Sequence, residues 1–268
     1  MIKKAVIPAA GYGTRSLPIT KVIPKEMFPI GGRPAIHYVV EEAVQSGIEE
    51  ILIIISRTKN LIMDYFDHSL ELEAFLERAN KTHLLEKTKL PNVHIQYVRQ
   101  SHAKGLGDAI SLAKPFTGKE SFAVMLPDDL FIPHQKPALQ ELIDVYNSHQ
   151  ANVLAVKEVE SKLLKDYGVI DAQLRSKGLY EIKDIVEKPT SSPPSKLAVT
   201  GRYVFTSKIY EALNQLTPGS GGELQLTDAI KAMLSEENYF AVESTADRFD
   251  VGKEEEYLRL CGLLKDRE

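Results

Sequence analysis

The sequence predicts an α/β protein whose sheet is wrapped by helices. Three observations support this fold class. Strand-like and helix-like segments alternate through the first half of the chain, several of the expected strands are mostly apolar, and a glycine-rich loop directly follows the first of them. Ligands of such open sheets bind at the carboxyl ends of the strands, so we expect functional residues to gather there.

Five strands are expected in the first half, at Lys4–Ile7, Glu50–Ile55, Val93–Val98, Phe122–Leu126 and Asn152–Val156. Helical patterns occupy the intervals, at Pro34–Gln45, Lys59–Phe66, Leu70–Ala79, Gly107–Ala113 and Lys136–His149. Proline is favoured in the first turn of a helix and glycine directly after its end, which suits Pro34 and Gly47. The first four strands are mostly apolar, which predicts that each is buried on both faces.

The chain changes in character from about Tyr167. Strands are expected at Gly168–Ala172, Leu179–Glu187, Leu197–Phe205, Tyr239–Glu243 and Arg248–Val251, with a hairpin turn at Arg175–Gly178. Helices are expected from Ser207, near Leu226 and from Lys253. No repeat emerges. We therefore expect one domain, 1–268, built from a first half to about residue 160 and a second half from about residue 161.

Composition excludes several classes of protein. The 268 residues are enough for a full core, and a net charge of −4 without basic blocks argues against a general nucleic-acid or membrane-surface binder. A single cysteine, Cys261, excludes an internal disulfide framework and a multi-thiolate metal site. The sequence contains no signal-peptide pattern and no apolar run long enough to span a bilayer, so it predicts a cytoplasmic protein.

The loop Ala9–Arg15 is typical of a site that wraps an anion. Its glycines, Gly11 and Gly13, let backbone N–H groups turn towards a phosphate without interference from a Cβ atom. Arg15 adds a forked cation, and Lys25 supplies a second positive charge ten residues later. This pattern favours a loop that binds a nucleoside triphosphate.

Two familiar phosphate loops do not fit. The dinucleotide fingerprint needs a third glycine where this chain has Ser16, and a Walker loop needs a Gly-Lys-Ser/Thr ending that is missing after Gly13. The remaining alternative is that the glycines only form a tight strand-to-helix turn. The cations that follow make that alternative less favourable.

Acidic residues follow a second buried strand, at Asp128 and Asp129. Because this strand ends at the ligand-binding edge, the pair is a candidate Mg²⁺ site beside a triphosphate, and Mg²⁺ needs only one or two protein carboxylates. Asp250 lies at the end of a late strand and could complete the site. The structural alternatives are that the acidic pair caps a turn and that Asp250 caps the helix starting at Lys253.

Polar and glycine residues follow the strand that ends at Val98. The amide of Gln100 can both donate and accept, which suits it to contact a base edge. Gly105 and Gly107 allow close approach of the backbone and a helix start that points at a ligand. A plain turn with Gln100 in solvent is an equally good interpretation when this segment is taken alone.

The second half contains two further polar motifs, Glu187-Lys188-Pro189 and the segment Gly221–Asp228. Carboxylates such as Glu223 can accept hydrogen bonds from sugar hydroxyls, and Lys188 can neutralise a phosphate. A strand exit and the start of a helix would explain each motif separately, but explain the whole set less well.

Together these motifs resemble the uridylyltransferase branch of the sugar-phosphate nucleotidyltransferases. The resemblance covers essentially the whole chain and runs in family order through Ala9–Arg15, Pro24–Met27, Gln100 with Lys104–Gly107, Pro127–Asp129, Tyr167–Ile170, Glu187–Pro189, Gly201–Tyr203, Gly221–Asp228 and Phe249–Gly252. It implies a Rossmann-like three-layer α/β/α nucleotidyltransferase fold with a mixed central sheet. It also implies Mg²⁺ dependence and the formation of UDP-glucose and pyrophosphate from UTP and glucose 1-phosphate.

The resemblance also implies roles for individual residues. The uridine would be held by Ala9, Ala10, Gly11, Gln100 and Gly105, with Glu26 near the nucleoside. The triphosphate would be held by Gly13, Thr14, Arg15 and Lys25, the metal by Asp128 and Asp250, and glucose 1-phosphate by Gly168, Glu187, Lys188 and Glu223. Arg15, Lys25 and Lys188 would be the catalytic cations. The family resemblance further suggests a homodimer or homotetramer.

The residues fit direct phosphoryl chemistry. The sugar phosphate is already ionised near neutral pH, so neither a general base nor a covalent nucleophile is needed, which agrees with the scattered histidines. The main obstacle is repulsion between two polyanions, which cations can relieve. Two alternatives stay open: a thymidylyltransferase, whose substrate differs by one methyl and one hydroxyl, and a non-catalytic relative that senses nucleotide sugars.

Overall fold

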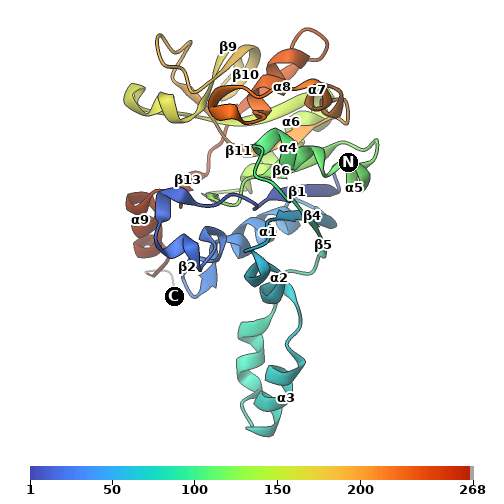
Figure 1. The fold of residues 1–268 in the computed structure, drawn as a ribbon, viewed down its shortest axis with the longest axis vertical. Helices are drawn as coiled ribbons and strands as arrows, with labels where there is room; N and C mark the ends of the chain where they lie inside the picture. The colour runs from blue at the N-terminus through green and yellow to red at the C-terminus, as the bar shows by residue number, and fades with distance from the viewer. Residues whose placement is uncertain (266–268) are drawn as a thin grey trace.

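Residues 1–265, which the computed structural model describes, form a nine-stranded mixed sheet with helices on both faces (Figure 1). The strand order is β5-β4-β1-β6-β11-β8-β12-β10-β9. The strands are β1 Lys4–Pro8, β2 Pro29–Ile30, β3 Arg33–Pro34, β4 Glu50–Ile55, β5 His94–Arg99, β6 Phe122–Met125, β7 Asp129–Ile132, β8 Asn152–Glu158, β9 Gly168–Ser176, β10 Leu179–Glu187, β11 Leu197–Phe205, β12 Tyr239–Glu243 and β13 Asp247–Asp250. The helices are α1 Ala35–Gln45, α2 Asn60–Phe66, α3 Leu70–Arg78, α4 Leu106–Ser111, α5 Lys114–Thr117, α6 Ala138–His149, α7 Ile209–Gln215, α8 Leu226–Met233 and α9 Glu254–Lys265. Residues 266–268 of the predicted domain lie outside the described residues.

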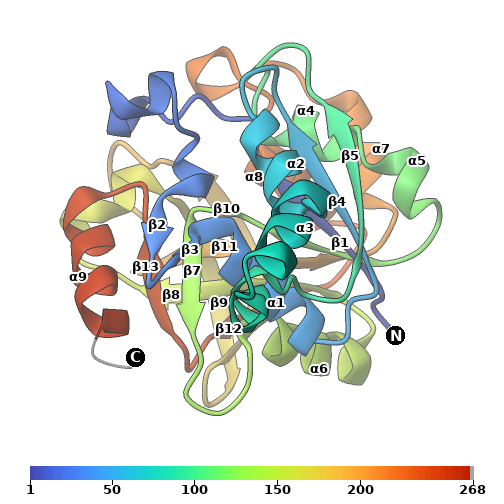
Figure 2. The same ribbon diagram turned by 90° about the horizontal axis from the view of Figure 1, so that it is seen from below.

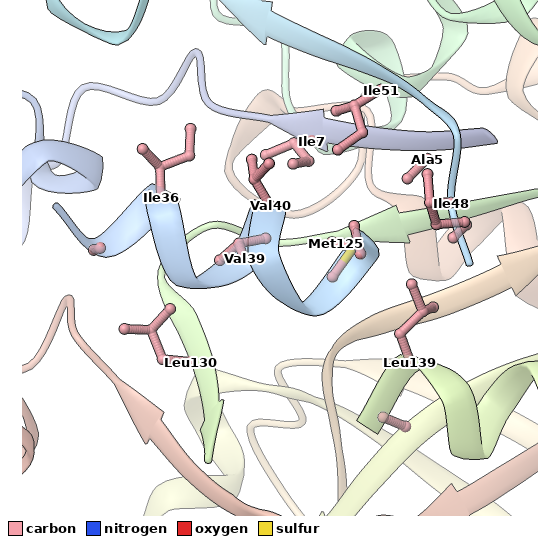
Figure 3. Packing of buried hydrophobic residues seen from close by; sticks show 14 of the residues in the cluster. Ala5, Ile7, Ile36, Val39, Val40, Ile48, Ile51, Met125, Leu130 and Leu139 are labelled. Carbon is pink, nitrogen blue, oxygen red and sulfur yellow. The ribbon is translucent and has the colours of Figure 1, made fainter. Parts of the chain in front are cut away.

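Alternating side chains divide the core into two layers. On β1, Ala5 and Ile7 pack with α1 and α6 on one face of the sheet, whereas Val6 packs with α4, α7 and α8 on the other. This alternation is the two-residue period of a strand, and both faces are apolar because both carry helices. Figure 3 shows Ile7 close to Val40 of α1 and Ala5 beside Ile48. The three-layer fold and the mixed sheet are therefore confirmed.

Strands β5, β4, β1 and β6 are parallel to one another, whereas β11 is antiparallel to both β6 and β8. The pairing of β11 with β6 joins the strands of the two halves into one continuous sheet. Figure 1 shows β9 and β10 at one end of the molecule and α3 projecting at the other, while both views place α9 beside β2 (Figures 1 and 2).

The expectation that Val93–Val98 is buried on both faces is wrong. The corresponding strand β5 is an edge strand, and His94, Gln96 and Arg99 are exposed. A strand with a neighbour on one side only has less cover, and its polar side chains can remain in water.

A small ribbon beside the main sheet was not predicted in full. The late strand β13 pairs antiparallel with β7, which the sequence analysis did not identify as a strand. Their register sets Asp250 directly opposite Asp129. The ribbon therefore brings an acidic residue from near the end of the chain to the two that follow β6.

A buried ion pair, Arg202 with Glu42, lies beside the segment that follows β6. The side chain of Arg202 on β11 has no exposed surface, and its guanidinium contacts Glu42 of α1 at 2.7 Å. Arg202 also donates to the carbonyl oxygens of Leu126 and Gly201 at 3.1 and 2.9 Å. The pair therefore holds the segment that leads from β6 to Asp128.

None of the helices formed by residues 1–265 has the length and apolar character that crossing a bilayer requires.

Candidate active site

A cavity of about 540 Å³ is lined by residues from both halves of the chain. We call it the main cavity. Seven of the predicted site residues line it, although they come from widely separated parts of the chain: Arg15, Asp128, Gly168, Glu187, Lys188, Glu223 and Asp250. The fold thus brings both predicted metal ligands and all the residues predicted to bind the sugar phosphate into one space.

A second cavity of about 400 Å³, the side cavity, is lined by Ala10, Tyr12, Ser56, Arg57, Thr58, Arg99, Gln100, Ser101 and Ala103. It includes two residues predicted to hold the uridine, Ala10 and Gln100. The amide nitrogen of Gln100 donates to Asp108 at 2.7 Å and to the carbonyl oxygen of Gly105 at 3.3 Å. These bonds fix the orientation of the amide, so its oxygen is presented in a defined direction.

Two loops run from the side cavity to the main cavity. One leads from Ala10 to Arg15, and the other leads from Gln100 to Leu106. The second loop is tied to the second half of the chain by hydrogen bonds between Leu224 N and Lys104 O and between Gly107 N and Leu224 O, both 2.8 Å.

Glycine is required where this loop meets the second half of the chain. Gly105 has φ +106°, and a Cβ atom there would lie 2.7 Å from the carbonyl oxygen of Leu224. Both the backbone conformation and the close approach exclude a larger residue.

The glycine-rich loop is exposed and is anchored at both ends. Ala9, itself buried, donates its N–H to Ile54 O at 2.7 Å. Gly13 adopts a left-handed conformation, with φ +67°, and its carbonyl oxygen accepts a hydrogen bond from Thr20 Oγ1 at 2.9 Å. Gly11 lies between these anchors and Thr14 directly follows the second one, and both are exposed, so their backbone groups can reach a ligand.

Two predicted cations converge on a predicted metal ligand. Asp128 Oδ2 accepts from Lys25 Nζ at 2.5 Å and from Arg15 Nη2 at 3.4 Å. Burial opposes ionisation of Asp128, but attraction to Lys25 and then Arg15 outweighs it and lowers the pKa of this carboxyl to about 2. Burial also opposes the charged form of Lys25, which by itself would lower its pKa, but the attraction of Asp128 outweighs burial and raises the pKa of Lys25. Both groups are therefore charged at neutral pH.

Asp250 combines a structural role with exposure to the cavity. Its Oδ1 accepts a hydrogen bond from Gly252 N at 3.0 Å, which shapes the turn before α9. Its Oδ2 faces Arg15 Nη1 at 3.0 Å. The alternative that Asp250 caps the helix is wrong, because Lys253, whose carbonyl oxygen accepts from Tyr257 N at 3.0 Å, directly precedes α9, and Asp250 is the last residue of β13. Since Asp128 and Asp250 contact one guanidinium, their carboxylates lie close together.

Asp129 is held away from these cations. Its Oδ1 pairs with Arg248, and its Oδ2 accepts from Gly201 N at 2.8 Å. Burial raises the pKa of Asp129 although Arg248 opposes this effect. The two neighbouring aspartates thus face different partners, and Asp128 is the one that shares partners with Asp250.

The residues predicted to bind the sugar phosphate are held by their neighbours. Glu187 accepts a hydrogen bond from Thr227 Oγ1 at 2.9 Å, and a Cβ atom on Gly168 would lie 2.7 Å from Thr227 Cγ2. Lys188 adopts φ +44°, an uncommon conformation for a residue with a side chain, and its Nζ lies 3.5 Å from Glu187 Oε1. Such strained positions are often found at ligand sites.

Glu26 does not line either cavity. Its side chain is 1% exposed and pairs with Lys59 Nζ at 2.6 Å. Burial raises the pKa of Glu26 despite the nearby lysines. Adjacent residues in a tight turn point in different directions, so Lys25 reaches Asp128 while Glu26 turns to the interior.

Three of the cavity residues that the sequence did not indicate are linked to one another: Tyr167, Arg248 and Lys253. Arg248 Nη1 and Lys253 Nζ both donate to the hydroxyl of Tyr167, at 3.1 and 2.9 Å. Tyr167 lay within a stretch that matched the family pattern, but nothing in the sequence indicated its partners.

The chain is similar to known proteins over nearly its whole length. A protein of Bacillus subtilis (strain 168) provisionally named as a UTP–glucose-1-phosphate uridylyltransferase is 55% identical over 97% of this chain and 96% of its own. The UTP–glucose-1-phosphate uridylyltransferase of Staphylococcus epidermidis is 47% identical over 94% of this chain and 88% of its own. A solved UDP-glucose pyrophosphorylase complexed with UDP-glucose is 40% identical, covers both chains completely and superposes with a TM-score of 0.89. The model of the nucleotidyl transferase family matches residues 4–266, and this chain therefore belongs to the nucleotidyl transferase family.

Proposed function

We propose that this protein transfers the uridylyl group of UTP to glucose 1-phosphate, which yields UDP-glucose and pyrophosphate. The observation that carries the proposal is the main cavity, where cations and carboxylates from both halves of the chain meet beside the glycine-rich loop. The similarity to UTP–glucose-1-phosphate uridylyltransferases supports the choice of both substrates.

The two substrates would occupy the two cavities. The side cavity would hold uracil against Ala10 and Gln100, and the loop through Gly11, Gly13 and Thr14 would carry the triphosphate towards Arg15. Ala9 would anchor the start of that loop to the sheet, because its buried N–H donates a hydrogen bond to Ile54 of β4. Gly105 would let the loop after Gln100 approach the base without a side chain in the way.

The sugar phosphate would occupy the main cavity. Glu187 and Glu223 would accept hydrogen bonds from glucose hydroxyls, and Gly168 would leave room for the ring. Lys188 would neutralise the phosphate. Glu26 would act indirectly, since its buried pair with Lys59 fixes the turn that presents Lys25.

A divalent cation, which we expect to be Mg²⁺, would be held by Asp128 and Asp250. Both carboxylates contact one guanidinium, and the low pKa of Asp128 keeps that carboxyl anionic, so the donor set fits a hard cation. Within residues 1–265, no three His, Cys, Asp or Glu side chains form a ready-made metal cage. Two carboxylates suit Mg²⁺, which takes its other ligands from water and phosphates. When bound, it would neutralise charge on the phosphate oxygens.

The reaction requires positioning rather than acid–base catalysis. An oxygen of the sugar phosphate forms a bond to the α-phosphorus of UTP, the bond from that phosphorus to the oxygen that bridges the α- and β-phosphates breaks, and pyrophosphate leaves with that oxygen. Arg15 and Lys25 would offset charge on the triphosphate, and Lys188 would do so on the attacking phosphate. The repulsion between the reactants is thereby reduced.

The continuous sheet supports treating the chain as a single domain with a nucleotide half and a sugar-phosphate half. A homodimer or homotetramer is the assembly that the family resemblance suggests, and light scattering coupled to size-exclusion chromatography would test it.

The proposal is tested by measuring pyrophosphate release across a grid of nucleoside triphosphates and sugar 1-phosphates, with Mg²⁺ and with chelator. We expect the highest kcat/KM with UTP and glucose 1-phosphate, and no turnover in chelator. Rejection of one methyl group is worth only ~1–3 kcal/mol, so slower use of dTTP is expected. A higher kcat/KM with dTTP would favour the thymidylyltransferase, and no product from any pair would favour a nucleotide-sugar sensor.

Lys188→Ala should raise the KM for glucose 1-phosphate by about 10- to 100-fold, because a charge-assisted contact to a phosphate is lost. The KM for UTP should change by less than about twofold. Lys196→Ala, which removes an exposed lysine that lines neither cavity, is the matched control. Equal loss of affinity for both substrates would argue against the place assigned to Lys188.

A further inference from the structure

Tyr167 lies between two groups of predicted site residues. One group is the metal ligands Asp128 and Asp250, and the other is the sugar-phosphate residues Gly168 and Lys188. The hydroxyl of Tyr167 accepts hydrogen bonds from Arg248 Nη1 at 3.1 Å and from Lys253 Nζ at 2.9 Å. The same two cations lie 5.2 and 5.0 Å from the centre of its ring. A phenol oxygen has two lone pairs, so the two donors use both of them.

Each of these cations is also tied to a predicted metal ligand or to its neighbour. Arg248 forms an ion pair with Asp129, which directly follows Asp128. The backbone N–H of Lys253 donates to the carbonyl oxygen of Asp250 at 2.9 Å. The hydroxyl of Tyr167 is therefore connected through two short routes to the segments that carry the two carboxylates.

The backbone of Tyr167 is tied to the other group. Its carbonyl oxygen accepts a hydrogen bond from Lys188 N at 2.9 Å, at the position where Lys188 adopts a positive φ. The next residue, Gly168, pairs in the sheet with Glu187. Tyr167 thus holds the sugar-phosphate segment by its backbone and the carboxylate segments by its side chain.

We propose that Tyr167 is a positioning residue that aligns Lys188 and Gly168 with the carboxylates of Asp128 and Asp250. The inference rests on the proposed function and adds a residue that neither the motifs nor the similarity assigned a role. Direct attack requires the reacting atoms to be held about 3–3.5 Å apart and in line, so a small shift between the two segments slows the reaction strongly.

The ring and the hydroxyl of Tyr167 do different things. The ring packs against the small apolar cluster of Leu164, Val169 and Ala198. Only the hydroxyl forms hydrogen bonds with Arg248 and Lys253, while the cation–π contacts of both residues are made with the ring, which phenylalanine keeps. Tyr167→Phe therefore removes the link and leaves the packing in place, which separates positioning from stability.

The test compares the steady-state kinetics and thermal unfolding of wild-type protein and Tyr167→Phe. We expect kcat/KM for glucose 1-phosphate to fall by about tenfold or more, because two charge-assisted hydrogen bonds are lost. The KM for UTP should stay within about twofold, and the melting temperature should be nearly unchanged. Tyr180→Phe is the matched control, since it also removes a tyrosine hydroxyl bonded to a charged residue, Glu243, but Tyr180 lines neither cavity.

A second variant tests the route through the hydroxyl. Lys253→Met removes one of its two donors, and its effect on kcat/KM should be less than additive with that of Tyr167→Phe. The inference would be overturned by additive effects of the two substitutions or by an unchanged kcat/KM in Tyr167→Phe. It would also be overturned if Tyr167→Phe lost affinity equally for both substrates and had a lowered melting temperature. Wild-type protein without turnover would instead overturn the proposed function, and the inference with it.

Discussion

Asp128→Asn is expected to reduce turnover at saturating Mg²⁺ by about 10²–10³-fold, the scale on which loss of one electrostatic contact to the transition state acts. The carboxylate is positioned by Lys25 and Arg15, which also keep it ionised at neutral pH. An amide of the same shape lacks the charge that a hard cation requires. The substitution also leaves the positive charges of Lys25 and Arg15 without their shared partner.

The fold should survive this substitution, because Asp128 lies on the wall of a cavity rather than in the apolar core. Circular dichroism and the melting curve provide that check. Asp171→Asn, an exposed aspartate on β9, should retain wild-type turnover. Near-normal turnover of Asp128→Asn at high Mg²⁺ would show that the metal assignment is wrong.

Glu42→Gln is expected to lower the free energy of unfolding by about 3–5 kcal/mol, because it leaves a buried guanidinium without its counter-charge. Arg202 makes three contacts with the Glu42 carboxylate, at 2.7 to 3.2 Å, and its side chain has no exposed surface. Glu42 also accepts a hydrogen bond from Leu139 N at 3.0 Å. The loss of stability should appear as a lower urea concentration at the unfolding midpoint, with little change in how steeply the free energy of unfolding falls with urea concentration.

Glu41→Gln provides the neighbouring control. Its side chain is partly exposed and lies 3.6 Å from Arg33, so its loss should change the free energy of unfolding by less than about 1 kcal/mol. A Glu42→Gln protein as stable as wild type would mean that Arg202 is not held by this pair. The support we infer for the segment before Asp128 would then have to come from elsewhere.

Local patterns were sufficient to locate most of the sheet. The limits of β4, β10, β11 and β12 agree with those predicted from apolar runs bounded by turn residues. Strand β7 was not predicted because it begins within the acidic pair, at Asp129, and pairs only with β13, which is more than 100 positions away. A short strand with a distant partner has no local pattern of its own.

The site was predictable to the extent that its residues lie in compact motifs. Arg15, Asp128 and Lys188 each belong to such a motif, and the structure brings them to one cavity. Tyr167 and Arg248 gain their importance from contacts across roughly 80 positions of sequence, which only the folded chain creates. Sequence spacing also says nothing about direction within a turn, so it could not show that Glu26 turns to the interior and pairs with Lys59.

We propose that cations from both halves of the chain hold two anionic substrates in register. A crystal structure of the protein with UDP-glucose tests it most directly. We expect uracil in the side cavity beside Ala10 and Gln100, the diphosphate near Arg15, and glucose in the main cavity against Glu187 and Glu223. A ligand bound elsewhere, remote from Gly11 and Gly13, would contradict the account.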